Sequence, residues 1–192
     1  TANNVTLTIN ADTTGRTKNG ISVDGGISGA TVIVGSGVTV SVTNNQAIDG
    51  TGSTNLTVTN SGTLSAVAKT IELEGSASGA VITNNFGGTI TATNNAIKTE
   101  NNTSNVTINN SGLISTTNIG HAIATATGTD SGMIINNFST GVIVKTSTAD
   151  AAQEAIELGD SGVITNSGQI RNDTSPSNTS IRLKGDNSTL TL

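Results

Sequence analysis

The sequence contains no cysteine, no tryptophan and no tyrosine, one proline, and only two phenylalanines, Phe86 and Phe138. Without cysteine, disulfide bridges and thiolate metal sites are excluded. Hydrophobic residues make up 33% of the chain and aromatic residues 1%, which is too little for a single thick globular core. Intrinsic disorder is not expected either, because disordered chains are rich in charge or proline, and only 11% of these residues are charged. A thin core shared by many short strands fits this composition.

The chain also lacks the features by which proteins bind nucleic acids or enter membranes. Its net charge is -5 at pH 7, whereas nucleic-acid and anionic-lipid partners require clustered Lys and Arg. No apolar run approaches the roughly 20 residues of a membrane-spanning helix, and no signal-peptide pattern opens the sequence. We therefore expect no nucleic-acid partner and no direct membrane insertion by this segment.

One phrase recurs along the chain, as Val58–Leu64, Ile108–Ile114 and Ile164–Ile170, each containing Asn-Ser-Gly or a close variant. Two looser copies, Ile82–Ile90 and Ile135–Ile143, fall between them. The glycines that anchor the five copies are Gly62, Gly88, Gly112, Gly141 and Gly168. Pairs of a small residue and isoleucine keep step with them, placing an Ile at 21, 48, 71, 97, 123, 156 and 181. A period of this length is typical of solenoids, in which each repeat buries its apolar face only by stacking on its neighbours.

Short alternating runs of β-branched residues between Asn-rich and Gly-rich connections predict three short strands in each repeat. No segment has helical periodicity. The sequence therefore predicts an all-β fold, a single-stranded parallel β-helix (β-solenoid) of about seven coils over residues 1–192. The alternation at Ile71–Glu74 predicts that isoleucine and leucine point inward and both carboxylates outward.

Stacking of equivalent coils predicts ladders of like residues. We expect the isoleucines to form one column in the core, and a column of asparagines at one corner, formed by Asn60, Asn84, Asn109, Asn136 and Asn166. The residues that follow the isoleucines are Asp49, Glu72, Lys98, Ala124, Glu157 and Arg182. This register places Glu72 beside Lys98, and Glu157 beside Arg182, as favourable cross-strand pairs.

No residue is assigned a catalytic, cofactor-binding or metal-binding role. Gly159–Gly162 spells the loop around the nucleophile of trypsin-like proteases, but Asp130–Gly132 repeats most of it one coil earlier, which indicates a turn. A catalytic serine also needs a histidine base, and we expect the only histidine, His121, to be a surface residue at a corner. Glycoside hydrolysis needs a pair of carboxylates across a cleft; the chain has carboxylates but no Trp or Tyr to form sugar-binding platforms.

The Thr-Asn-Ser-Gly-Thr-Leu and Asn-Ser-Gly-Leu-Ile phrases, set between Val/Ile strands and Ala-Ile strands, resemble the passenger domains of bacterial autotransporters. The resemblance covers nearly the whole chain and implies a right-handed β-helix that is secreted from, or displayed on, a Gram-negative cell surface. It also implies that this segment belongs to a longer passenger, in a parent protein with a C-terminal outer-membrane barrel. These phrases are scaffold, so they indicate architecture more than activity.

The function implied by this resemblance is a non-enzymatic adhesin or virulence factor that binds a host cell-surface protein or matrix. Two alternatives stay open: a released passenger that activates a host-cell receptor, and a structural spacer or carbohydrate-active β-helix. The corners between the second and third strands of each coil lengthen toward the C-terminus, and long solenoid insertions often carry binding sites. We expect the two longest to form one protrusion, with a helical turn at Asp150–Glu154. The candidate binding residues there are Ser147, Thr148, Asp150, Gln153, Glu154, Asp173, Ser175, Pro176 and Asn178.

Overall fold

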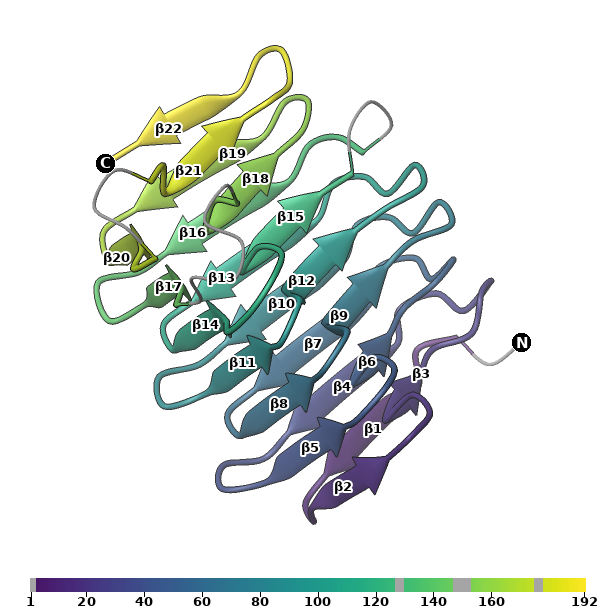
Figure 1. The fold of residues 1–192 in the computed structure, drawn as a ribbon. Coiled ribbons are helices and arrows are strands. Elements are labelled where there is room, and N and C mark those ends of the chain that lie inside the picture. The colour runs from purple at the N-terminus through teal and green to yellow at the C-terminus, as the bar shows by residue number, and fades with distance from the viewer. Residues whose placement is uncertain (1–2, 127–129, 147–152, 175–177) are drawn as a thin grey trace.

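The computed structural model describes residues 3–126, 130–146, 153–174 and 178–192. These residues form a parallel β-solenoid of about seven coils with three strands in each, as the sequence predicts (Figure 1). The chain runs from one end of the stack to the other, and each strand pairs with the equivalent strand of the next coil. No helix occurs among the described residues, and so none of them forms a helix able to cross a membrane.

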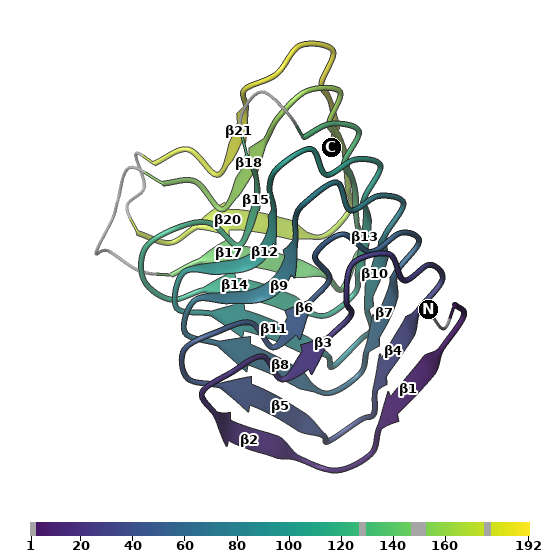
Figure 2. The same cartoon turned by 90° about the vertical axis from the view of Figure 1, so that its right-hand side faces the viewer.

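The strands form three parallel sheets around a narrow core (Figure 2). Sheet A contains β1 (Thr6–Ile9), β4 (Thr31–Val34), β7 (Thr57–Asn60), β10 (Val81–Asn84), β13 (Thr107–Asn110), β16 (Ile134–Asn137), β19 (Val163–Asn166) and β22 (Thr189–Thr191). Sheet B contains β2 (Thr13–Arg16), β5 (Thr39–Val42), β8 (Thr63–Ala66), β11 (Thr89–Ala92), β14 (Leu113–Thr116), β17 (Val142–Lys145) and β20 (Gln169–Asn172). Sheet C contains β3 (Ile21–Ser22), β6 (Ile48–Asp49), β9 (Lys69–Leu73), β12 (Asn95–Thr99), β15 (Ile123–Thr125), β18 (Ile156–Leu158) and β21 (Ile181–Leu183).

The core consists of columns of aliphatic side chains that run along the stack. Each strand position that faces inward contributes one such column. The isoleucine column of sheet C is confirmed: Ile48 pairs with Ile71, and the pairing continues through Ile97, Ile123, Ile156 and Ile181. Ile48, Ile71 and Ile97 are fully buried. Because adjacent strands lie about 4.8 Å apart, each of these side chains packs directly on its equivalent in the next coil.

The asparagine column is confirmed, but two of its members were assigned wrongly. The ladder runs through Asn60, Asn84, Asn110 and Asn137, which are buried, to the partly buried Asn166, and not through Asn109 and Asn136. The amide of each donates to the side-chain oxygen of the next, at 2.9, 2.9, 2.8 and 2.7 Å along the ladder. Asn109 and Asn136 form a separate pair in the neighbouring column, where Asn136 Nδ2 donates to Asn109 Oδ1 at 2.9 Å. The error arose because Asn109-Asn110 and Asn136-Asn137 are doublets, and a shift of one residue exchanges the two faces of a strand.

A second column of equivalent residues lies at the corner that leads into sheet A. Each of its residues has a left-handed backbone conformation. Its members are Asn4, Gly29, Asn55, Gly79, Asn105, Gly132, Ser161 and Asn187, with φ angles between 53° and 71°. The residues just before six of them, from Ser28 to Asp160, are bridged from coil to coil, including Ser131 with Asp160. Asparagine and glycine tolerate this conformation best, which explains why they fill all but one of these positions. Ser161, within the protease-like Gly159–Gly162 phrase, therefore occupies the same corner position as these asparagines and glycines.

Candidate functional site

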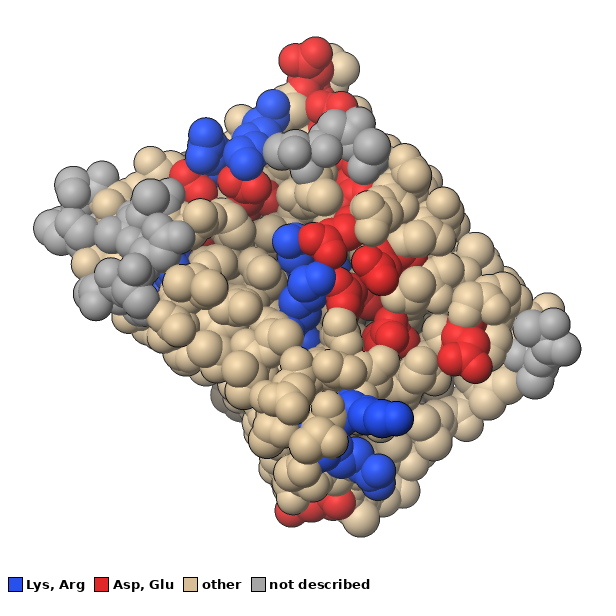
Figure 3. All heavy atoms as spheres, turned by 45° about the vertical axis from the view of Figure 1, so that its right-hand side comes forward, with Lys and Arg blue, Asp and Glu red and all other residues tan. Residues whose placement is uncertain are grey.

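Charged side chains are concentrated on one side of the solenoid. The eight strands of sheet A, all of them described, contain no Asp, Glu, Lys or Arg. Sheet C and the residues that flank its strands instead carry what we call the charged face: Asp49, Lys69, Glu72, Glu74, Lys98, Glu100, Glu154, Glu157, Arg182 and Lys184. In space-filling view, acidic and basic side chains meet in a band across this side of the molecule (Figure 3).

The register predicted for this face is confirmed. Asp49 pairs with Glu72, Glu72 with Lys98, and Glu157 with Arg182 on successive coils. The ion pairs, however, do not follow the register: two lie within one coil, and one runs diagonally from Lys69 to Glu100 on the next coil. Lys69 binds both Glu72 and Glu100, and Lys98 binds Glu100 at 2.6 Å. Diagonal partners are within reach because lysine and glutamate side chains are long enough to span neighbouring positions.

Burial and hydrogen bonding shift the pKa values of this network. Burial raises the pKa of Glu72 above its usual value, although hydrogen bonds from Lys69 and Gln46 oppose the shift. Burial alone would also raise the pKa of Glu100, but hydrogen bonds from Lys69 and Lys98 lower it to about 2. The alternation predicts that Glu72 points outward, but its exposed fraction is only 3%. It does point away from the core, as the alternation predicts, but the side chains of Gln46 and Lys69 cover it.

A second polar cluster lies near the C-terminal end of the charged face. His121 is buried there between Glu154 and Glu157, with 3.9 Å from its Nδ1 to Glu154 Oε2 and from its Nε2 to Glu157 Oε2. Lys184 Nζ binds Glu157 at 2.7 Å, and Arg182 lies 3.5 Å from Glu154. The prediction that His121 is a surface residue is wrong, because its exposed fraction is only 7%. Glu154 lies two residues before β18, and its carbonyl oxygen is 2.9 Å from His121 Nδ1.

We expect His121 to titrate below its usual pKa of about 6.5. Burial lowers the pKa of His121, and nearby Lys145 adds to this, while Glu157, Glu154 and a 2.9 Å hydrogen bond to the Glu154 carbonyl oppose it. The unfolded chain then binds a proton that the folded chain does not, so stability should fall as the pH drops from about 6.5 toward the folded pKa. Because the chain has one histidine, proton NMR of the unlabelled protein measures this pKa directly. The His121→Gln variant is the control for the stability change, and a folded pKa at or above 6.5 would contradict the expectation.

Two groups of described residues hold potential metal-ligating atoms within 4.8 Å of one another, His121 with Glu154 and Glu157, and Glu72 with Glu74 and Glu100. In both groups, carboxylates already bind Lys or Arg side chains. Those cations neutralise the carboxylates and oppose the entry of a metal ion. We interpret both groups as ion-pair networks.

The core column nearest this face changes from apolar to polar toward the C-terminus. Its successive members are Val42, Ala66, Ala92, Thr116, Lys145 and Asn172. The polar members bind main-chain carbonyls of the lengthening corners: fully buried Lys145 donates to Asn118 and Gly120, at 2.8 and 3.1 Å. Asn172 donates to the carbonyls of Gln153 and Thr179, at 2.9 and 3.1 Å. Sequence reasoning missed Lys145, although a lone lysine at the end of the Val142–Lys145 strand marks the point where this column turns polar.

The predicted binding residues are only partly described. Ser147, Thr148, Asp150, Ser175 and Pro176 lie outside the described residues, as does most of the expected helical turn. Of the others, Glu154 is buried, Asp173 forms an exposed ion pair with Arg171 at 3.1 Å, and Asn178 donates to Thr174. The lengthening of the corners between sheets B and C is confirmed by the strand bounds. Asn172 ties Gln153 in one long corner to Thr179 in the next, so the two corners lie on adjacent coils.

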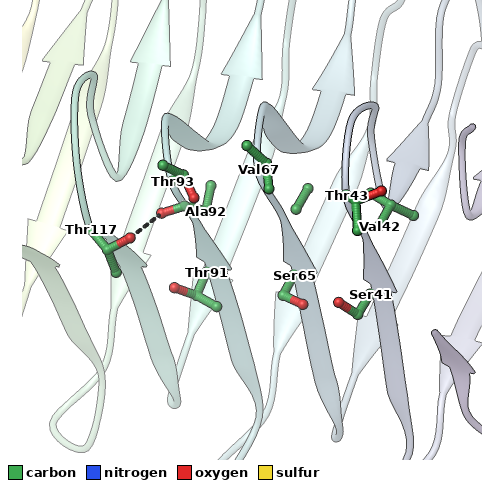
Figure 4. A pocket seen from close by; sticks show the side chains of 10 residues that line it. Ser41, Val42, Thr43, Ser65, Val67, Thr91, Ala92, Thr93 and Thr117 are labelled. Carbon is green, nitrogen blue, oxygen red and sulfur yellow. Dashed lines mark hydrogen bonds between the residues drawn. The ribbon is translucent and has the colours of Figure 1, made fainter. Parts of the chain in front are cut away.

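An uncharged depression of about 310 Å³ lies where sheet B turns toward sheet C (Figure 4). Its floor is formed by the two-residue corners after β8 and β11, which lie between the longer corners of the coils on either side. Hydroxyl and small aliphatic side chains line it: Ser41, Val42, Thr43, Ser65, Ala66, Val67, Thr91, Ala92, Thr93 and Thr117. Thr117 is held by a 3.3 Å hydrogen bond to the Ala92 carbonyl. With no titratable group in its lining, this depression offers no acid, base or charged ligand contact.

No protein-family model matches the chain, and no significant similarity to a curated protein or to a solved structure was found.

Proposed function

We propose that this β-solenoid is part of a secreted or surface-displayed passenger of the autotransporter type, and that it acts as a non-enzymatic adhesin for a host-cell protein or matrix component. The sequence phrases described above support the passenger assignment. The binding role is supported by one observation: the strands of sheet C carry six charged residues and those of sheet B three, while the strands of sheet A carry none.

A scaffold needs no such asymmetry. The uncharged Thr and Asn side chains of sheet A already make its exposed face polar, without any charged residue. Mixed acidic and basic side chains on one face give a surface that pairs with a complementary charge pattern and orients its partner. Arg182 is half-exposed, and Lys98 and Lys184 reach the surface. The charged face is therefore the surface that we assign to the partner.

The test compares two triple variants of the purified chain for binding to cultured mammalian cells and to immobilised matrix proteins. One removes charges from the charged face, by Glu74→Gln, Lys98→Gln and Arg182→Gln. The matched control makes the same number of changes on sheet A, by Thr59→Gln, Thr83→Gln and Asn136→Gln. We expect the first to bind about tenfold more weakly or not at all, and the second to bind like the unmodified chain.

Binding should also weaken as salt rises, because exposed charges are screened at high ionic strength. Salt-independent binding, or a loss confined to the sheet A variant, would contradict the proposal. A cell response at concentrations that coat no surface would instead favour a released receptor ligand.

A further inference from the structure

The corners that join sheet A to sheet B alternate in length from coil to coil. They contain four residues after β4, β10 and β16, and two residues after β7, β13 and β19. Each four-residue corner is a turn closed by a hydrogen bond between its last amide and first carbonyl: Val38 to Gly35 at 3.2 Å, Gly88 to Asn85 at 2.9 Å, and Gly141 to Phe138 at 2.8 Å. The long corners therefore form ridges with the short corners recessed between them, a two-coil repeat that the single-coil sequence pattern does not reveal.

Both phenylalanines of the chain lie on these ridges. Phe86 is on the ridge after β10 and is 79% exposed, and Phe138 is on the ridge after β16 and is 48% exposed. The chain has no other Phe, Trp or Tyr, so no aromatic side chain of these types packs in the core. Exposing a large apolar ring forgoes about 2 kcal/mol of burial free energy. Aromatic residues are enriched at the centres of binding interfaces relative to the rest of a protein surface.

A notch of about 250 Å³ adjoins the Phe86 ridge and spans the recessed corner between the two ridges. Ser111 and Gly112 line it from the short corner, Leu113 from the start of β14, and Thr140 and Val142 from the second ridge and the strand after it. No charged side chain lines the notch, and sheet A beside it has none. The two ridges are separated by two strand spacings, about 10 Å.

We propose that these aromatic ridges and the notch between them form a binding site for a neutral, extended glycan chain. Pyranose rings present faces of C–H groups that stack on aromatic rings, and their hydroxyls require neutral donors and acceptors such as Ser111 and Thr140. In a β-linked glycan every second sugar presents the same face. The distance between two such sugars is comparable to the distance between the two ridges. The absence of charge in the lining matches an uncharged ligand and disfavours an anionic one. The site lies away from the charged face and does not depend on the proposed function.

The composition of the chain makes a direct test possible. Its aromatic proton NMR signals come only from Phe86, Phe138 and His121, so the unlabelled protein can be titrated with defined sugars. The probes are cellohexaose and chitohexaose as neutral β-linked chains, maltohexaose as a bent neutral chain, and a heparin hexasaccharide as an anionic chain. We expect both phenylalanine ring systems to shift with at least one β-linked probe, and to shift much less with maltohexaose or heparin.

Variants then connect the signal to the site. Phe86→Ala and Phe138→Ala should each weaken binding about tenfold, because each removes a stacking platform. Val67→Ala is the matched control, since Val67 is also 48% exposed but lies at another corner, and it should bind normally. The proposal is overturned if no β-linked probe shifts the phenylalanine signals at millimolar concentration, or if binding survives both phenylalanine variants. Shifts produced only by a blocked apolar peptide, such as acetyl-Leu-Leu-amide, would also overturn it and assign the notch to a protein partner.

Discussion

Replacing Gly112 by alanine is expected to lower the free energy of unfolding by at least about 4 kcal/mol, among the largest effects of a single substitution. An added Cβ at this position would lie 2.5 Å from the carbonyl oxygen of Asn85 and closer still to that of Gly88. Both atoms belong to the backbone of the preceding coil, so no side-chain rotation relieves the clash. The coil that contains β13 must then separate locally from the coil that contains β10, and stacking is what stabilises each coil.

The same geometry recurs at Gly62 and Gly168, where an added Cβ would also meet two carbonyl oxygens of the preceding long corner. This explains why every copy of the Asn-Ser-Gly phrase has a glycine at this position of its short corner. Gly25→Ala is the matched control, because its Cβ would meet the Thr51 carbonyl oxygen at 3.6 Å and the Gly52 Cα at 3.9 Å, which are ordinary van der Waals contacts. Chemical denaturation should show the Gly25 variant within about 1 kcal/mol of the unmodified chain. Equal effects of the two substitutions would contradict the packing described at the corner.

Replacing Asn110 by alanine is expected to cost about 3 kcal/mol, because it interrupts the buried asparagine ladder. Asn110 Nδ2 donates to Asn137 at 2.8 Å and to the Gly112 carbonyl at 3.2 Å, and its Oδ1 accepts from Asn84 at 2.9 Å. Truncation leaves groups on both neighbouring coils without these partners, and each unsatisfied buried polar group costs about 1–3 kcal/mol.

Asn109→Ala provides the comparison, since it removes the same side chain one residue earlier. Asn109 Oδ1 accepts one hydrogen bond, from Asn136, outside the core. We expect a change within about 0.5 kcal/mol for this variant. The two unfolding curves together test the register, because the assignment made from sequence alone put Asn109 in the ladder and predicts the opposite order.

Periodicity was sufficient to predict the three sheets and the residue pairing on sheet C, since every coil repeats the same small-residue–Ile signal. It was not sufficient at Asn109 and Asn110, because a doublet of identical residues carries no information about which member points inward. Alternation likewise predicted the direction of Glu72 but not its burial. Burial of such a side chain depends on long neighbours that fold over it, and Gln46 comes from another coil.

The cluster around His121 shows a second limit of sequence reasoning. Glu154 and Glu157 lie more than thirty residues from His121 in the chain and reach it only because the corners after β14 and β17 are long. Nothing local to His121 marks it as buried. Lys145 was missed for the same reason, because its partners Asn118 and Gly120 lie in the preceding coil.

Disulfide trapping measures the parallel, in-register stack most directly, because the chain contains no cysteine of its own. Thr59 and Thr83 are register partners on β7 and β10, so their Cα atoms lie about 4.8 Å apart, within the range that a disulfide spans. The double variant Thr59→Cys with Thr83→Cys should therefore close an intramolecular disulfide on mild oxidation, detected by peptide mass mapping. Thr59→Cys with Thr165→Cys places the two thiols four strand spacings apart, about 19 Å, and should stay reduced in the monomer. Failure of the first pair to close, or closure of the second within a monomer, would contradict the solenoid register.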